Sequence, residues 1–147
     1  MSDVEGATQP NLRDLACEIG QVQVYWCFLE NEMQRLLDEG GSAQTLDKGL
    51  IVSRWKRLMK TVRGSDQTKI KSLIEAVETV ARMRNLLAHG IKVVNANPWE
   101  ENTAYAICRE QNGTEHKLTI DMIKNLSCDI ERITLSLRRV ERDIHDA

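Results

Sequence analysis

Apolar residues recur every three or four positions over long stretches of this 147-residue chain. Such spacing places the apolar side chains on one face of an α-helix. The first stretch begins after Asn11, whose side chain can cap a helix, and ends at Gly40 and Gly41. We therefore predict one long helix that packs against a partner. Its apolar face consists of Leu12, Leu15, Ile19, Val22, Trp26, Leu29, Met33 and Leu36.

Two more helices are expected in the middle of the chain. The first covers about residues 46–62, and its apolar side consists of Leu50, Ile51, Trp55, Leu58, Met59 and Val62. The second starts where Ser65 or Asp66 can cap it and ends at Gly90. Its apolar face includes Ile70, Leu73, Ile74, Val77, Val80 and Ala81.

After Gly90 the apolar period changes from helical to alternating, which favours β-strands. The Asn112-Gly113 pair is the signal of a two-residue type I′ turn, so a hairpin is expected. Pairing outward from this turn places Arg109 opposite His116, Ile107 opposite Leu118 and Tyr105 opposite Ile120. We predict a hairpin insertion over about residues 91–119, with a third strand at residues 91–94 and Pro98-Trp99 in the connecting loop.

A last helix is predicted from Thr119 or Ile120 to the end of the chain. Its apolar positions are Ile123, Leu126, Ile130, Ile133, Leu137, Val140 and Ile144. The predicted fold is mainly all-α: an antiparallel helical bundle of four to five helices, with a small β-hairpin insertion between the third and last long helices. The first and last helices should pack lengthwise. Residues 1–10 are expected to be a flexible lead-in to a single domain at residues 11–147.

Composition narrows the class of protein. The longest apolar run, from Val24 to Leu29, is far shorter than the roughly 20 residues that cross a bilayer. The N-terminus lacks the basic start and apolar stretch of a signal peptide. We therefore expect a cytoplasmic protein with no membrane partner. The six aromatic residues are too few to read single-stranded nucleic acid base by base.

The four cysteines are widely spaced, without a C-x-x-C pair or a histidine at zinc-ligand spacing. We expect no metal site and no cofactor. The interpretation that fits this spacing best is that the cysteines are reduced and fill apolar space. They are Cys17, Cys27, Cys108 and Cys128.

The net charge of −2 hides an uneven distribution. Residues 1–39 hold eight acids and two bases, whereas residues 52–71 hold seven bases and one acid. On the second helix the bases are expected to form a positive strip that attracts a polyanion such as RNA. They could instead pair with the acidic first helix or only be solvated, and Trp55 among them could stack on a base or belong to the core. The strip consists of Arg54, Lys56, Arg57, Lys60 and Arg63.

Arg84 falls in the middle of the apolar stripe of the third helix when residues advance by ~100° each. A guanidinium has no neutral form and is costly to bury alone, so it must meet a carboxylate, a phosphate or water. Alternatively, its aliphatic part lies along the apolar face while the guanidinium reaches water, or it bonds an acid such as Glu30 or Glu75.

Arg82, Asn85 and His89 share the flank beside this stripe, where a polar pocket can form. His89 lies in the last turn, just before Gly90. Imidazole has an ordinary pKa of about 6.5, so a histidine at this place can exchange protons at cellular pH. A histidine at a helix end can also act only as a cap that compensates the helix dipole.

The string from Arg84 to Gly90, Arg-Asn-Leu-Leu-Ala-His-Gly, resembles the R-N-x-x-A-H form of the R-x4-6-H motif of the HEPN superfamily. These are compact helical domains found in many prokaryotic RNA-cleaving toxins and antiviral effectors. The resemblance implies a metal-independent endoribonuclease, a toxin or phage-defence component. His89 would be the general base, or base and acid in turn, for attack of a ribose 2′-hydroxyl on the adjacent phosphate. Arg84 would bind that phosphate, Asn85 would orient His89 or a phosphate oxygen, and the product would be a 2′,3′-cyclic phosphate.

The resemblance also implies a homodimer in which two protomers join their motifs into one composite active site. The long apolar stripes of the first and last helices independently favour a two-fold dimer. RNA is the expected partner, contacted by Arg82 and the basic strip, and the resemblance allows a neutralising antitoxin protein. Two alternatives are a non-catalytic HEPN-like module that binds RNA, a nucleotide or a protein, and a plain helical interaction domain.

Overall fold

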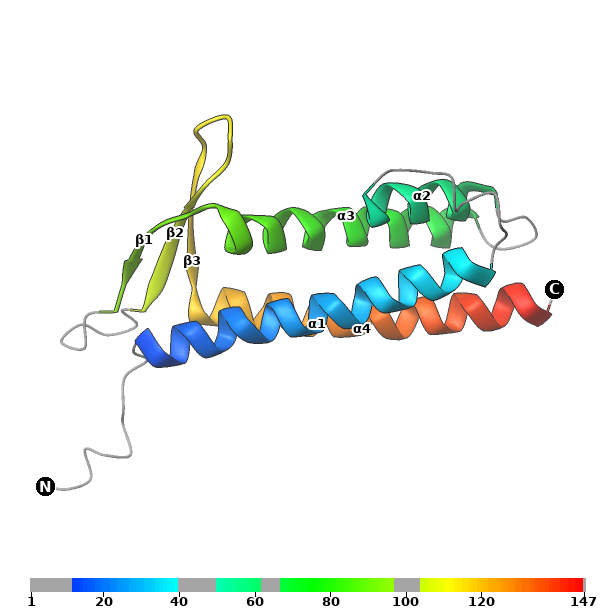
Figure 1. The fold of residues 1–147 in the computed structure, drawn as a ribbon, viewed down its shortest axis with the longest axis horizontal. Helices are drawn as coiled ribbons and strands as arrows, with labels where there is room; N and C mark the ends of the chain where they lie inside the picture. Colours follow the sequence, from blue (N-terminus) through cyan, green and yellow to red (C-terminus); the bar gives the residue numbers. More distant parts are fainter. Residues whose placement is uncertain (1–11, 40–49, 62–66, 97–103, 147) are drawn as a thin grey trace, which may run out of the picture. The chain divides into compact units, whose positions relative to one another are not determined.

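The computed structural model describes residues 12–39, 50–61, 67–96 and 104–146, and side chains only as far as residue 139. In these ranges the chain is mainly helical, with a small antiparallel sheet (Figure 1). The mainly helical class is therefore confirmed. The elements are α1 (Leu12–Glu39), α2 (Ile51–Thr61), α3 (Gln67–His89), β1 (Ile91–Asn95), β2 (Tyr105–Arg109), β3 (Glu115–Thr119) and α4 (Ile120–Asp146).

Helix α2 begins later than its apolar pattern predicts. Leu50 is not helical and is 81% exposed, so its place on the apolar side of the helix was predicted wrongly. Its carbonyl accepts a hydrogen bond of 3.1 Å from the backbone N–H of Arg54, so Leu50 directly precedes the first turn. The predicted caps Asn11, Ser65 and Asp66, the glycine pair at 40–41, Val62 and the Pro98-Trp99 loop lie outside the described residues.

The structure divides into two compact units. Among described residues, the first holds α1 up to Gln23, α3 from Met83, the sheet, and α4 up to Ser127. The second holds the remainder of α1, α2, the remainder of α3, and α4 from Cys128. The interpretation of residues 11–147 as one domain stays a prediction.

The core of the second unit is built from the apolar positions that the helical spacing predicts. Trp55 is completely buried, so it belongs to this core, and the alternative that it stacks on a base was wrong. The buried residues of this unit also include Trp26, Leu29, Met33, Leu36, Leu58, Met59, Ile70, Ile74, Val77, Val80, Ile130, Ile133 and Leu137. The predicted apolar positions Val140 and Ile144 lie beyond the described side chains.

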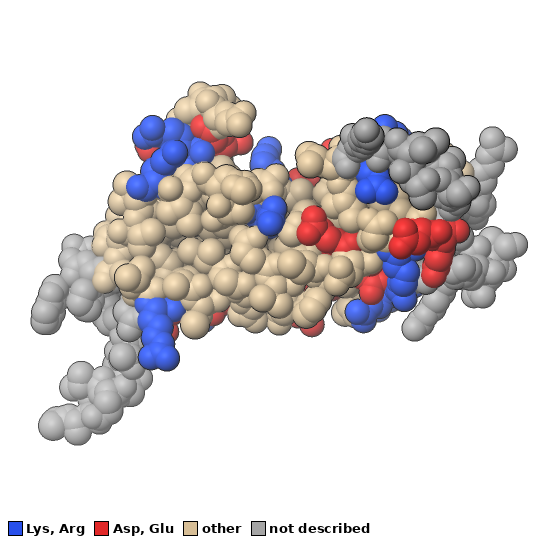
Figure 2. Space-filling model, in the orientation of Figure 1, with Lys and Arg blue, Asp and Glu red and all other residues tan. Residues whose placement is uncertain are grey.

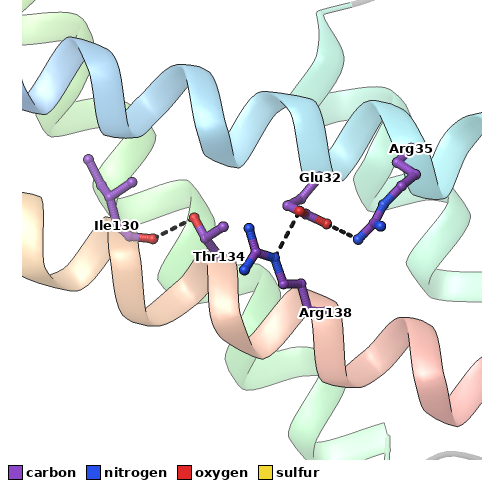
Figure 3. A network of polar contacts seen from close by, with 5 residues as sticks. All are labelled: Glu32, Arg35, Ile130, Thr134 and Arg138. Carbon is purple, nitrogen blue, oxygen red and sulfur yellow. Dashed lines mark hydrogen bonds and ion pairs between the residues drawn. The ribbon is translucent and has the colours of Figure 1, made fainter.

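A polar network joins α1 to α4 inside the second unit (Figure 3). Glu32 of α1 accepts hydrogen bonds from Arg138 Nε of α4, at 2.9 Å, and from Arg35. The Glu32 side chain is only 12% exposed, whereas the Arg138 side chain is 52% exposed, so only the carboxylate of this ion pair is shielded from water. On α4 the buried Thr134 hydroxyl donates to the carbonyl of Ile130 at 2.8 Å.

In this unit α1 and α4 run side by side in the same direction (Figures 1 and 3). Antiparallel packing was therefore a wrong prediction for this pair of helices. The reason is the length of α2: its 11 residues cover about 16 Å, against about 42 Å for the 28 residues of α1. Because α2 cannot run the length of the long helices, only α1, α3 and α4 alternate in direction. Helix α3 runs opposite to both α1 and α4, so α1 and α4 are parallel.

The three strands form an antiparallel sheet in the order β1-β2-β3. The register of the hairpin differs by one residue from the predicted register. Arg109 pairs with Glu115, Cys108 with His116 and Ala106 with Leu118. Because side chains alternate between the two faces of a strand, this shift exchanges the faces of β2. Ala106 and Cys108 are therefore buried, whereas Tyr105 and Ile107 are partly exposed.

The turn explains the shift. The backbone N–H of Glu110 donates to Thr114 O, and that of Gly113 donates to Glu110 O, both at 2.9 Å. Gly113 has a φ of 93°, in the left-handed region. This is a three-residue loop with glycine at its last position, which adds one residue to the two-residue turn that Asn-Gly predicts.

Helix α4 follows β3 without a loop. Thr119 Oγ1 accepts a hydrogen bond of 3.2 Å from the backbone N–H of Met122, so Thr119 is the N-cap and the predicted start of this helix is confirmed.

The cysteines do not share one environment. Cys108 is buried in the sheet, and desolvation raises the pKa of its thiol. Cys17, Cys27 and Cys128 are exposed, so the expectation that cysteines fill apolar space was wrong for these three.

Candidate functional site

The sequence motif from Arg84 to His89 occupies the last turns of α3, in the first unit. Leu86 and Leu87 within it are buried and anchor this end of the helix in the core. The backbone N–H of Gly90 still donates to Leu86 O at 2.8 Å, so the helical pattern continues to the last residue before β1. The motif is therefore held on regular, well-packed backbone.

Arg84 is partly buried and makes two side-chain hydrogen bonds to amide oxygens. Its Nε donates to Gln23 Oε1 of α1 at 2.9 Å, and its Nη1 donates to Asn85 Oδ1 at 3.1 Å. The two bonds fix the plane of the guanidinium between α1 and α3. A carboxylate, a phosphate or water was expected beside this arginine, and the amide of Gln23 was missed. The only signal for it was a polar side chain at the edge of the apolar stripe, next to Val22.

Asn85 is exposed, and its side-chain oxygen accepts a hydrogen bond from the neighbouring guanidinium. The HEPN resemblance implies that it orients His89 or a phosphate oxygen, and this role stays a prediction.

His89 is the exposed last residue of α3. In an ideal helix, residues five positions apart are rotated by about 140° and separated by about 7.5 Å along the axis. Arg84 faces α1, where it bonds Gln23, so within one chain the two ends of the motif do not share a face of α3. The imidazole is accessible to a substrate or to a second protomer.

The predicted RNA-binding residues differ in exposure. In the second unit Arg82, Arg57 and Lys60 are exposed, whereas Arg54 and Lys56 are partly buried. Lys56 Nζ lies 3.1 Å from Glu78 Oε2 of α3, so part of the strip pairs with a neighbouring acid that is not on the first helix. Arg63 lies outside the described residues.

The sheet carries three exposed basic side chains outside the predicted RNA-binding residues: Lys92, Arg109 and Lys117. Figure 2 shows lysine and arginine atoms over this part of the first unit, with acidic atoms beside them. Arg109 Nη2 lies 3.1 Å from Glu115 Oε2, and Lys117 Nζ lies 4.3 Å from the centre of the Tyr105 ring. These bases belong to three strands that are separate in the sequence, and the pairing of the strands places them in one sheet.

Among the described residues, no three histidine, cysteine, aspartate or glutamate side chains come close enough together to hold a metal ion.

None of the helices in the described ranges has an apolar stretch long enough to cross a membrane.

Comparison with known proteins returns no matching family model, no matching curated protein and no matching solved structure.

Proposed function

We propose that this chain is a HEPN-like, metal-independent endoribonuclease built on a helical bundle with a sheet inserted before the last helix. The observation that carries the proposal is the arrangement at the end of α3. Gln23 and Asn85 hold the guanidinium of Arg84, and the imidazole of His89 is exposed five positions later. A base for the 2′-hydroxyl and a cation for the phosphate are two groups that metal-free RNA cleavage can use.

In the proposed reaction, His89 removes the proton of a ribose 2′-hydroxyl, which attacks the adjacent phosphate. Positioned proton transfer of this kind contributes ~10²- to 10⁴-fold. Arg84 and His89 of one chain face different sides of α3, so a second protomer supplies the arginine to this site. Arg84 donates hydrogen bonds to the phosphate oxygens, on which negative charge develops. Since Gln23 and Asn85 already fix its guanidinium, little reorganisation is needed during the reaction. The bond between phosphorus and the 5′-oxygen breaks, that oxygen takes up a proton, and the product is a 2′,3′-cyclic phosphate. The setting is a toxin with a neutralising antitoxin or an antiviral defence system.

The exposed bases support this proposal. Lys92, Arg109 and Lys117 give the unit that carries the motif a set of positive side chains of its own. Arg57 and Lys60 add exposed bases on α2. Contacts of this type bind the RNA backbone independently of sequence and weaken as salt increases.

The proposal is tested by cleavage of single-stranded and structured RNA in EDTA. Wild-type protein should cut RNA, and Arg84→Ala and His89→Ala should each lower the rate by about 10²-fold or more, because each removes a group needed in the transition state. Lys71→Ala is the matched control, since it removes an exposed base from the same helix but lies outside the motif. It should retain nearly full activity.

Cleavage that requires a metal ion, or that survives both motif substitutions, contradicts the proposed mechanism. A second candidate function is favoured by the exposed bases of the sheet: a non-catalytic module that binds RNA. Folded protein that binds RNA with a steep salt dependence but never cuts it selects this candidate.

A further inference from the structure

The hairpin carries a histidine and a carboxylate in direct contact. His116 Nε2 of β3 lies 2.8 Å from Glu110 Oε2, at the end of β2. Both side chains are partly buried, with 36% of His116 and 27% of Glu110 exposed. A carboxylate at this distance orients the imidazole ring through one nitrogen and leaves Nδ1 as the nitrogen that can exchange a proton.

Backbone contacts place this pair beside the end of α3. The N–H of Arg109 donates to Gly90 O at 2.8 Å, which joins β2 to the residue that follows His89. Cys108 pairs with Ile91 on one side and with His116 on the other. The backbone of His116 therefore lies two strand spacings, about 10 Å, from the start of β1. Figure 1 shows the hairpin passing the end of α3.

The joint between α3 and the hairpin is tight. A Cβ atom added to Gly90 would lie 2.9 Å from Leu86 O and 3.0 Å from Arg109 O. Both neighbours are backbone atoms, which cannot turn away as a flexible side chain can. The distance between the hairpin and the last turn of α3 is therefore set by the backbone itself, and the site residues on both sides have fixed positions in one unit.

We propose that His116, oriented by Glu110, is the proton donor to the leaving group in RNA cleavage by this protein. This inference rests on the proposed function. As the 2′-oxygen forms its bond to phosphorus, its proton passes to His89. As the bond between phosphorus and the 5′-oxygen breaks, that oxygen receives a proton from the His116 imidazolium.

With two histidines, one residue no longer has to act as both the base and the acid of the reaction. If His89 acts alone, it must release the proton that it has just accepted, in the correct direction, within the same step. With His116 as the acid, base and acid are both in place before the step begins. The competing donor is the partner subunit's His89 in a composite site, and the experiment below separates the two.

The test compares two dinucleotide substrates that differ only in the leaving atom, 5′-oxygen or 5′-sulfur. A sulfur leaving group departs as a thiolate and needs no proton, because thiols are far more acidic than alcohols. His116→Gln should cleave the 5′-oxygen substrate about 10²-fold more slowly than wild type but the 5′-sulfur substrate within about threefold of wild type. His89→Ala should be slow on both, because the 2′-hydroxyl still needs a base.

Glu110→Gln should show the same pattern with a smaller loss, about tenfold on the oxygen substrate. The His116 ring can still donate a proton but loses the carboxylate that orients it. Glu115→Gln is the matched control: it breaks the cross-strand ion pair with Arg109 on the same hairpin and should leave both rates within about twofold. If His116→Gln does not fold, the ratio of sulfur to oxygen rates for Glu110→Gln decides in its place.

A loss by His116→Gln that is equal on both substrates means a structural or binding role and overturns the inference. Unchanged cleavage by His116→Gln, together with loss in His89→Ala, overturns the inference but leaves the proposed function standing and points to the partner subunit's His89. Wild-type protein that cleaves neither substrate overturns the proposed function and this inference together.

Discussion

Arg84 is a charged residue whose side chain is partly removed from water at the end of α3. Its place in an apolar stripe predicts a conflict between burial and charge, which a carboxylate, a phosphate or water would resolve. The structure supplies two amide oxygens, from Gln23 and Asn85. Asn85 is the next residue, but Gln23 is 61 positions away, and nothing local in the sequence identifies it. The need for a partner was predictable, whereas the identity of the partner was not.

Two glycines provide a matched test of local packing. Gly90→Ala should lower the free energy of unfolding by about 1–3 kcal/mol, because the new methyl group meets backbone oxygens of Leu86 and Arg109. Gly20→Ala lies inside α1 with nothing within 4 Å, so it should raise that free energy by about 0.5–1 kcal/mol through helix propensity. Urea unfolding followed by circular dichroism measures both. Equal effects of the two substitutions would contradict the tight joint at Gly90.

At the scale of elements, the hairpin and α2 show that apolar periodicity predicts the elements but not the strand register or the direction of the helices. Both predicted strands of the hairpin exist, but the turn holds one residue more than Asn-Gly predicts, and the faces of β2 are exchanged. A buried face of alanine and cysteine is less apolar than the predicted face, so composition alone favours the wrong register. Helix α2 exists but excludes Leu50, and it is too short to run the length of α1, so α1 and α4 are parallel.

The Glu32 network should stabilise the pairing of α1 with α4. Glu32→Gln should lower the free energy of unfolding by about 1–2 kcal/mol, because Arg138 and Arg35 lose a shielded carboxylate. Asp129→Asn is the control, since its pair with Arg132 on α4 is exposed and should contribute less than about 0.5 kcal/mol. Thermal unfolding at low and high salt measures both. A larger loss for Asp129→Asn would show that Glu32 does not join the two helices as described.

At the scale of the whole molecule, one chain supplies one copy of the R-x4-H motif, with Arg84 and His89 rotated apart on α3. The proposed composite site between two protomers would bring an arginine and a histidine together without requiring them to share a face of one helix. The net charge of −2 is a poor guide to partners, because exposed bases on α2 and on the sheet coexist with acidic segments elsewhere.

The proposed composite site predicts complementation. Arg84→Ala and His89→Ala should each be inactive, but their mixture should regain activity after subunit exchange, because about half of randomly paired dimers then contain one intact arginine and one intact histidine. RNA cleavage measures the recovery, and light scattering measures the mass. A monomer at assay concentration, or dimers whose mixture stays inactive, would contradict the composite site.

By itself, the sequence determined which segments are helical, where the strands lie, that Trp26 and most other apolar positions form the core, and that Arg84 needs an oxygen partner. These follow from local spacing, because one helix face or strand face must be buried wherever the chain folds. Only the tertiary structure decided the register of β2, the choice of Gln23, the pairing of Lys56 with Glu78, and the place of His116 beside the end of α3. Each of these depends on residues far apart in the chain, whose meeting is set by turn geometry and packing that local spacing does not encode.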